Sequence, residues 1–325
     1  SRLVGSEMCI RDRTNLKMKK VLILGASGYV GSELFKSVNI IGGCNIMVLG
    51  NENIDYRLWE SCDLITGGLG NFNLENLLRF SPDTIFHLAR LKGEGRVGRY
   101  FASKKGRRYN VALKSFLSSN SLNLTLVYFS GTLLYGDRKN EIVNEDNEIN
   151  PTSFARQYHI AETPWYESIG SENFTTIMLR LPWVVGNGSW FIGSYINYAV
   201  NHGYVPLYGD GANWMSLIDR EDCCSLAIHL RKKVKVDTTI NIFNPELIFR
   251  QIDFAEALSD VLGLKMKKVD ISEYAWRDPA LKEAMSFSLK VDTKHTNLYE
   301  GFTFKISDLE LLIKRNLPTD LHGTD

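Results

Sequence analysis

The chain has 325 residues, with 38 Lys and Arg against 37 Asp and Glu, and 44% of its residues are apolar. This is the composition of an ordinary globular protein, long enough for two domains. A net charge of +1 argues against nucleic acid as a partner, although a local basic patch is compatible with it. No apolar run approaches the roughly 20 residues of a membrane-spanning helix, and we expect a cytoplasmic protein.

The first residues do not fit the rest of the chain. Residues 3–13, LVGSEMCIRDR, look like a translated sequencing adaptor, so we treat residues 1–17 as an adaptor-derived or disordered tail. The natural chain is then expected to begin at Met18. The cysteines after it show no metal-ligand spacing, and we expect reduced, mostly buried thiols and no metal site.

A glycine-rich turn organises the part of the chain that follows. The apolar run VLIL at residues 21–24 predicts a strand that stops at Gly25, and glycines recur at Gly28 and Gly31 before an apolar helical pattern. Without Cβ atoms the backbone can approach a pyrophosphate, and the N-terminus of a helix offers free N–H groups. The spacing favours a dinucleotide site over a turn that is merely tightly packed.

Further apolar segments alternate with helical patterns along the chain. Strands are predicted at residues 45–49, 62–65, 84–89, 124–129, 175–181 and 238–243, and helices at 110–118 and 154–169. This alternation predicts an α/β fold with a Rossmann-like, doubly wound parallel sheet. We expect residues 18–184, with a further strand near 238–244, to form the dinucleotide-binding domain. Residues 185–237 and 245–325 are expected to form a smaller, discontinuous substrate domain.

Two segments leave alternatives open. After the second strand, where many dinucleotide sites place an acid on the ribose, the chain has Gly50, Asn51 and Glu52, with no adjacent Arg. Asn51 can hydrogen-bond a ribose, but the choice between NAD and NADP stays open. Residues 91–109 are polar and basic and are predicted to be a mobile loop, whose cations face either a phosphate or, in the favoured interpretation, solvent.

Taken together, these residues resemble the extended short-chain dehydrogenase/reductase family, which contains the nucleotide-sugar epimerases and dehydratases. The features that carry the resemblance occur in family order over nearly the whole chain after Met18. They are GASGYVG at 25–31, Asp63-Leu64, HLA at 87–89, Asn110, LLYG at 133–136, RLP at 180–182, Val185-Gly186 and GDGANWMSLIDRED at 209–222.

The resemblance implies an NAD or NADP cofactor, a nucleotide-sugar-like substrate and a homodimer. It also implies which residues contact the cofactor, with Asp63 and Leu64 at the adenine. The implied contacts are Gly25, Ser27, Gly28, Tyr29, Val30, Gly31, Asn51, Asp63, Leu64, Leu88, Ala89, Arg90, Ser130, Tyr158 and Pro182.

The catalytic triad of the family is not present at its expected positions. The family uses a Ser or Thr, a Tyr acting as acid and base, and a Lys one helical turn later that lowers the pKa of the phenol. Those positions fall on Gly131, Phe154 and Tyr158, while Glu162 matches a later acid of the family. The substrate-domain Arg that grips the pyrophosphate in the family falls on Met215.

Neighbouring residues offer substitutes, and Thr132 and Tyr158 are the candidate catalytic residues. Ser130 and Thr132 flank Gly131, and Tyr158 shares a helix face with Phe154 because side chains four residues apart are neighbours. The favoured alternative for Tyr158 is a phenol that hydrogen-bonds the ribose without chemistry. His159 points about 100° away around the helix. A YxxxK pattern at residues 100–104 precedes the fifth strand and is interpreted as a coincidence.

Two functions therefore remain. The first is an NAD(P)-dependent oxidoreductase that acts on a nucleotide-sugar-like substrate by hydride transfer, with atypical catalytic residues. The second is a catalytically inactive cofactor-binding sensor, assembly module or RNA-binding module on the same scaffold, with nucleic acid the weaker branch because of the neutral charge.

Overall fold

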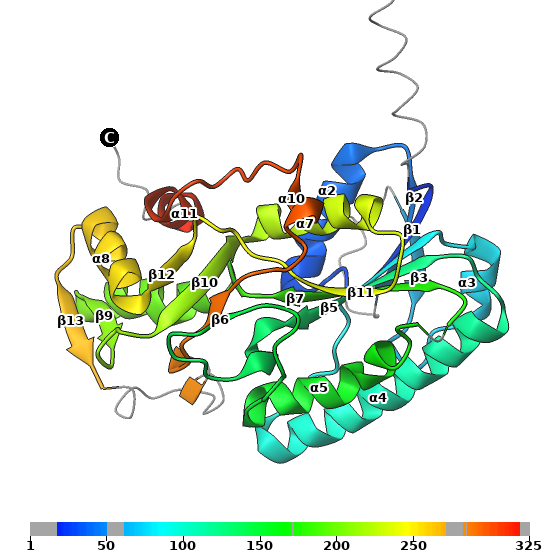
Figure 1. Ribbon diagram of the computed structural model, residues 1–325, viewed down its shortest axis with the longest axis horizontal. Coiled ribbons are helices and arrows are strands. Elements are labelled where there is room, and N and C mark those ends of the chain that lie inside the picture. Colours follow the sequence, from blue (N-terminus) through cyan, green and yellow to red (C-terminus); the bar gives the residue numbers. More distant parts are fainter. Residues whose placement is uncertain (1–17, 51–61, 171, 271–281, 284, 319–325) are drawn as a thin grey trace, which may run out of the picture.

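The structure is a computed structural model, and it describes residues 18–50, 62–170, 172–270, 282–283 and 285–318. Two layers of helices enclose a central sheet, and a second lobe lies beside them (Figure 1). No helix in these ranges is long and apolar enough to cross a membrane.

The central sheet has seven strands, all parallel, in the order β11-β7-β5-β4-β1-β2-β3. All seven segments that the sequence predicts as strands take part in it, which confirms the fold class. The order reverses between β1 and β4, and the crevice at the carboxyl ends of these two strands is where such sheets bind ligands. The strands are β1 (Lys20–Leu24), β2 (Asn45–Gly50), β3 (Asp63–Thr66), β4 (Thr84–His87), β5 (Thr125–Gly131), β7 (Thr175–Leu181) and β11 (Thr238–Asn241).

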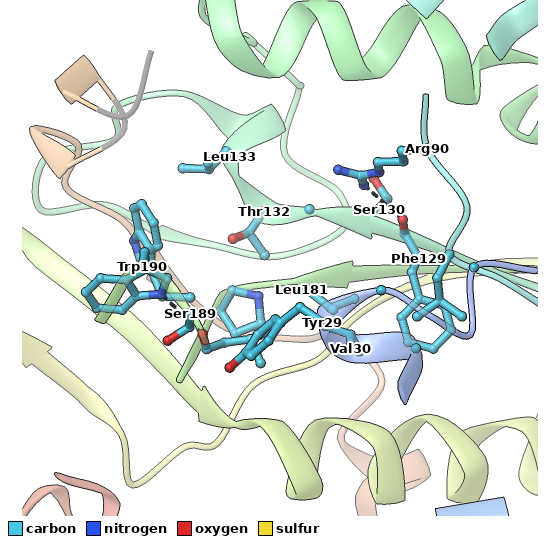
Figure 2. A pocket seen from close by; sticks show the side chains of 18 of the residues that line it. Tyr29, Val30, Arg90, Phe129, Ser130, Thr132, Leu133, Leu181, Ser189 and Trp190 are labelled. Atoms are coloured by element: carbon cyan, nitrogen blue, oxygen red, sulfur yellow. Dashed lines mark hydrogen bonds between the residues drawn. The ribbon is translucent and has the colours of Figure 1, made fainter. Parts of the chain in front are cut away.

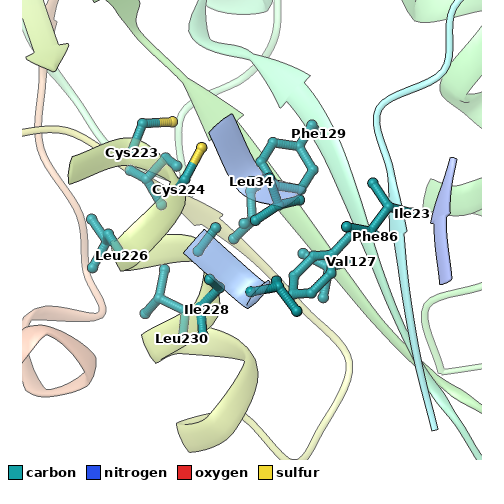
Figure 3. Close-up of a cluster of buried hydrophobic side chains, with 14 of the residues drawn as sticks. Ile23, Leu34, Phe86, Val127, Phe129, Cys223, Cys224, Leu226, Ile228 and Leu230 are labelled. Atoms are coloured by element: carbon teal, nitrogen blue, oxygen red, sulfur yellow. The ribbon is translucent and has the colours of Figure 1, made fainter. Parts of the chain in front are cut away.

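Alternate residues of the strands point to opposite faces, and each face carries its own helices. Helices α2 (Tyr29–Ile41) and α7 (Arg220–Lys233) pack on one face. Figure 3 shows side chains of α7, such as Leu226 and Ile228, meeting Phe86 and Val127 of the sheet. The opposite face carries α3 (Glu75–Phe80), α4 (Gly95–Ser119) and α5 (Ser153–Tyr166).

The prediction of a loop at residues 91–109 is wrong, because helix α4 begins at Gly95 and runs without a break to Ser119. Its buried face as far as Asn110 is made of small and polar residues, Ser103, Gly106 and Asn110, rather than apolar ones. A Cβ at Gly106 would lie 3.4 Å from Ala161 of α5, so the two helices approach closely there. A helix that packs through small residues lacks the apolar periodicity on which the prediction depends.

The second lobe has its own apolar core, separate from the sheet. Its three-stranded sheet has the order β12-β10-β8, and a two-stranded sheet pairs β13 with β9. The elements are β8 (Trp183–Val185), a π-helical turn (Ile192–Ile196), α6 (Asn197–His202), β9 (Val205–Tyr208), β10 (Trp214–Asp219), β12 (Ile248–Arg250), α8 (Gln251–Leu262), β13 (Met266–Val269) and α11 (Leu309–Asn316). The segment 185–237 is thus divided, since α7 packs on the central sheet with α2.

A late segment of the chain ties the two lobes to the loop after β5. Strand β14 (Lys290–Val291) pairs with β6 (Ile142–Val143), and α10 (Thr296–Tyr299) follows it on the α7 side. Glu145 accepts hydrogen bonds from Asn241 N at 2.6 Å and Thr293 Oγ1 at 2.6 Å. Met18, the predicted start, is buried beside β1.

Candidate active site

The glycine turn between β1 and α2 brings three parts of the backbone into contact. Gly25 has φ +93°, a conformation that side chains other than glycine rarely adopt. A Cβ on Gly25 would lie 2.7 Å from the backbone nitrogen of Ala89, and one on Gly31 would overlap the carbonyl of Gly25. The turn therefore needs glycine so that α2 can begin directly against the ends of β1 and β4.

The N-terminus of α2 has no side-chain cap. Its N-cap residue is Gly28, which has no side chain to accept from the first N–H groups, and the first turn holds no acidic residue. The first N–H groups of a helix carry partial positive charge and have no partner within the helix. Over a cleft lined by Gly25 and Gly28, they form a cradle that fits the pyrophosphate of a dinucleotide.

Two cavities lie on either side of this turn and share Gly25, Gly28, Leu88 and Arg90. The small cavity, of about 490 Å³, lies towards the second lobe. The large cavity, of about 1030 Å³, lies towards β2, β3 and the start of α4. Together they form one elongated cleft along the carboxyl edge of the sheet.

Most of the predicted cofactor contacts lie on this cleft. Tyr29, Val30, Gly31, Ser130 and Pro182 line the small cavity, Ser27, Ala89 and Tyr158 line the large one, and Gly25, Gly28, Leu88 and Arg90 line both. The catalytic candidate Thr132 also lines the small cavity. Figure 2 shows Tyr29, Val30 and Thr132 around the small cavity. Asn51 lies outside the described residues.

Asp63 and Leu64 line neither cavity. They begin β3, level with Met47 and Val48 of β2, whereas the carboxyl end of β3 leads to Gly67, Gly68 and Leu69. These three residues and Leu49 line the large cavity, and sequence reasoning missed them. The direction of β3 could have identified them, because only residues at or after the last position of a parallel strand lie at the carboxyl edge of the sheet, where the ligand binds.

The small cavity also has an aromatic wall that sequence reasoning did not assign to the site. Trp183 and Trp190 line it, with their ring centroids 5.0 Å apart. Trp190 donates from Nε1 to the carbonyl of Val184 at 3.2 Å, which fixes its ring. The polar side chains in this cavity carry hydroxyls, indoles and one guanidinium; among the described lining residues there is no carboxylate, imidazole, thiol or amine.

The triad positions have separate locations in the site. Gly131 ends β5 and lines the small cavity in extended conformation, with φ −147°. Phe154 lines neither cavity, and its ring centroid lies 4.7 Å from that of Tyr158. Met215, at the position of the family's phosphate-binding Arg, is buried in the core of the second lobe.

Arg90 brings a positive charge to Tyr158. It follows β4, and its Nη2 donates to the carbonyl of Phe129 at 2.9 Å (Figure 2). Its guanidinium carbon lies 4.8 Å from the centroid of the Tyr158 ring, which is a cation–π contact. Arg90 is the one basic residue that lines both cavities among those described.

Buried polar contacts fix the strand ends beneath the cleft. His87 is fully buried, burial lowers its pKa to about 4, and Nε2 lies 2.9 Å from Oδ1 of Asn110. Asn110 in turn donates to the carbonyl of Ala161 at 2.7 Å, so it joins β4, α4 and α5. Burial raises the pKa of Tyr166 to about 12, and its hydroxyl lies 3.4 Å from Ser130 Oγ.

Two further sequence predictions concern the YxxxK pattern and metal ligands. In the YxxxK pattern at residues 100–104, Tyr100 and Lys104 lie on the outer face of α4, where Lys104 contacts the ring of Tyr100, and neither lines a cavity, whereas Ser103 between them is buried and lines the large one. No cluster of three or more potential metal ligands occurs within the part of the chain that the structure describes.

A parallel sheet with the order 3-2-1-4-5-7-11 and an uncapped glycine turn at its switch point define a dinucleotide-binding Rossmann protein. A sequence model of the NAD dependent epimerase/dehydratase family matches residues 21–244. The chain belongs to this family. A search of the curated proteins gives no significant match.

Solved structures share the fold at low sequence identity. A UDP-N-acetylglucosamine 4-epimerase from Methanobrevibacter ruminantium M1 in complex with UDP-N-acetylmuramic acid is 19% identical, with a TM-score of 0.72, covering 92% of this chain and 98% of its own. A UDP-glucuronic acid 4-epimerase from Bacillus cereus in complex with NAD is 16% identical, with a TM-score of 0.73 and coverages of 90% and 96%. The Helicobacter pylori ADP-L-glycero-D-manno-heptose-6-epimerase is 18% identical, with a TM-score of 0.73 and coverages of 95% and 98%.

Proposed function

We propose that the protein binds a nicotinamide dinucleotide along the whole cleft and catalyses hydride transfer on a nucleotide-sugar-like substrate in the small cavity. The observation that carries this is the position of the uncapped glycine turn, which lies between two cavities rather than at the end of one. A dinucleotide has the same layout, with a central pyrophosphate and a nucleoside on each side. Family membership and the nucleotide-sugar epimerases among the structural neighbours support the choice of substrate class.

The large cavity would hold the adenosine half of the cofactor. Leu49 and Leu69 provide apolar surface there, and Gly67 and Gly68 leave room at the end of β3. We therefore propose the adenine contact at these residues, which lie at the carboxyl edge, rather than at Asp63 and Leu64, which line neither cavity. The small cavity would hold the nicotinamide half beside Val30 and Pro182.

The bound cofactor would supply the hydride acceptor and donor, and the chain would handle the proton. Thr132 lines the small cavity and directly follows Gly131, which occupies the position of the family's Ser or Thr. Its hydroxyl would orient a hydroxyl of the substrate. Tyr158 lines only the large cavity, so its phenol would act at a ribose hydroxyl of the cofactor rather than on the substrate itself. In the usual triad a Lys lies beside the phenol, and here Arg90 contributes the positive charge beside the Tyr158 ring instead.

A second candidate function has a specific observation behind it. The small cavity has no carboxylate, imidazole or amine among its described lining residues, and Phe154 lies outside it. Acid–base catalysis needs a group that changes its protonation near the working pH. A cofactor-binding protein without turnover, acting as a sensor or assembly module, would need no such group.

Binding and turnover are tested separately. Titration of the purified protein with NAD and NADP, followed by the fluorescence of Trp183 and Trp190 in the small cavity, is expected to show saturable quenching for at least one of them. Absence of binding to both would overturn the proposal. Incubation with nucleotide sugars, followed by chromatography of the products, then tests turnover, and Thr132→Ala and Tyr158→Phe are expected to reduce it at least tenfold.

Restoring the triad distinguishes the two functions. The variant Gly131→Ser/Phe154→Tyr/Tyr158→Lys is sterically acceptable at its first position, since a Cβ there would lie 3.8 Å from the Leu181 carbonyl. Turnover that appears in this variant but not in the parent supports the inactive alternative. Turnover already present in the parent excludes it.

A further inference from the structure

The two ends of the small cavity differ in chemistry. Arg90 is the one charged residue among its described lining residues, and Figure 2 shows Arg90 and Trp190 at opposite ends of the cavity. Around Trp190 the lining is made by Trp183, with its ring centroid 5.0 Å from that of Trp190, and by Ser189. The end towards the second lobe therefore offers aromatic surface and a hydroxyl but no charge.

The two arginines beside β10 are engaged outside this cavity and do not line it. Arg220 follows β10, and its Nη2 lies 3.0 Å from Oε2 of Glu33. Arg250 lies opposite Trp214 in the pairing of β12 with β10, and its guanidinium is 5.2 Å from the centroid of the Trp214 ring. Met215, at the position of the family's phosphate-binding Arg, is buried. A pyrophosphate at this end of the cavity would lose water without gaining a cation from these positions.

The indoles in the cavity are held in place. Trp190 donates from Nε1 to the carbonyl of Val184 at 3.2 Å and packs on the aromatic core of the second lobe. In the described part of the chain, no cation lies over the ring of Trp183 or Trp190, whereas Lys290 lies 4.1 Å from the centroid of the Trp214 ring. Fixed rings without a cation over them form a surface that a ligand can use at little cost in ordering.

We propose that Trp183 and Trp190 form a platform on which the sugar ring of the substrate stacks, and that this ring, rather than a nucleoside diphosphate, supplies most of the binding free energy. The C–H groups on one side of a pyranose are weakly positive and pack on the negative face of an indole. Its hydroxyls would reach those of Thr132 and Ser189, which line the same cavity. The substrate class is then an uncharged pyranoside, with or without a nucleotide attached. This inference rests on the proposed function.

The position of the platform favours the reacting ring over the other rings that a cofactor or a nucleotide would bring. Trp183 pairs with Leu217 in the sheet of the second lobe, whereas the nicotinamide is proposed beside Val30 and Pro182. Hydride transfer requires the reacting carbon to lie against the nicotinamide, so the substrate ring in this cavity is the sugar. A nucleotide base is separated from that sugar by the whole diphosphate.

The test measures binding to the full-length protein in the presence of NAD by saturation-transfer NMR. The probes are the methyl glycosides of glucose, galactose and N-acetylglucosamine, the three UDP-sugars with the same rings, and UDP alone. At least one glycoside is expected to bind within tenfold of its UDP-sugar, with the strongest saturation on the C–H groups of one ring face. UDP alone should bind at least tenfold more weakly than that UDP-sugar. UDP binding as tight as that of the UDP-sugars, or no binding of any glycoside, would overturn the proposal.

Substitutions assign the effect to the platform. Trp183→Ala should weaken glycoside binding at least tenfold and leave NAD binding within about twofold, and Trp183→Phe, which keeps a ring, should bind glycoside within about threefold of the parent. Trp214→Ala is the matched control, because Trp214 is also a half-buried tryptophan of the second lobe but lines neither cavity. Equal weakening by Trp183→Ala and Trp214→Ala refutes the platform. Equal loss of NAD and glycoside binding in Trp183→Ala also refutes it, because the indole would then contact the cofactor.

Calorimetric titration with NAD and NADP separates this inference from the proposed function, since its signal does not depend on tryptophan fluorescence. Binding of NAD or NADP without binding of any glycoside would refute the platform alone. Glycoside binding that Trp183→Ala abolishes, in a protein that binds neither NAD nor NADP, would refute the proposed hydride transfer and leave the platform in place.

Discussion

His87 should make the fold sensitive to acid to an extent that can be worked out from its burial. The side chain is fully buried at the end of β4, and burial lowers its pKa to about 4, from an ordinary value of 6.5. Between these two values the unfolded chain binds a proton on this imidazole and the folded chain does not. The free energy of unfolding must therefore fall as the pH falls through this window.

The size of the effect follows from the gap between the two pKa values. A gap of about 2.5, at about 1.36 kcal/mol for each pKa unit, amounts to about 3 kcal/mol once the pH is below 4. Between pH 7 and pH 5 the expected decrease is about 2 kcal/mol. This is a large part of the roughly 5–15 kcal/mol that holds a typical domain folded.

Urea unfolding of the parent and of His87→Gln, at several pH values between 7 and 4, measures this decrease directly. Glutamine stays neutral and keeps a donor for Oδ1 of Asn110, so the stability of the variant should fall less steeply by the amount above. Carboxylates titrate equally in both proteins, and their contribution cancels in the difference. His202→Gln, at an exposed histidine, is the control. Parallel curves for the parent and His87→Gln would refute the reasoning.

Three other predictions concern the turn, the cleft and a helix cap. Gly25→Ala should lower Tm and weaken cofactor binding more than tenfold, because its Cβ would meet backbone at 2.7 Å with φ at +93°. Arg90→Met should weaken cofactor binding about tenfold in fluorescence titration while leaving Tm nearly unchanged; unaltered affinity would exclude a role for its charge. Asp219→Ala should lower the free energy of unfolding by about 1–3 kcal/mol, because the buried Asp219 side chain caps α7. Asp308→Ala, at the exposed N-cap of α11, should lower it by about 1 kcal/mol. Equal losses in thermal unfolding of the two variants would contradict the role given to burial.

The sheet can be predicted from the sequence because its strands bury both faces. Residues 21–24 and 124–129 are apolar runs for this reason, and runs of that kind are visible without any contact information. The glycine turn is equally visible, because its close approach to the backbone at Ala89 restricts the residue types.

The features that the sequence does not reveal depend on contacts between distant residues. Arg90 and Tyr158 meet although 68 positions separate them, and no periodicity relates one to the other. The first part of helix α4 cannot be predicted from apolar periodicity, because Gly106 packs against Ala161 through its small size rather than through an apolar side chain. The expectation that Asp63 lies at the adenine depends on a matching dipeptide, which carries no information on strand direction; Gly67 and Gly68, which follow the strand, are the residues that line the large cavity.

The pairing of β14 with β6 has a consequence for synthesis of the chain. Glu145 receives its partner Thr293 from 148 residues further along the chain. A ribosome adds about 5–20 residues per second, so the loop after β5 waits roughly 7–30 s for the strand that secures it. During that interval the nascent protein has its glycine turn and most of its sheet, but β6 and Glu145 lack their partners in β14 and Thr293. A chaperone that binds unpaired segments would act mainly in this interval.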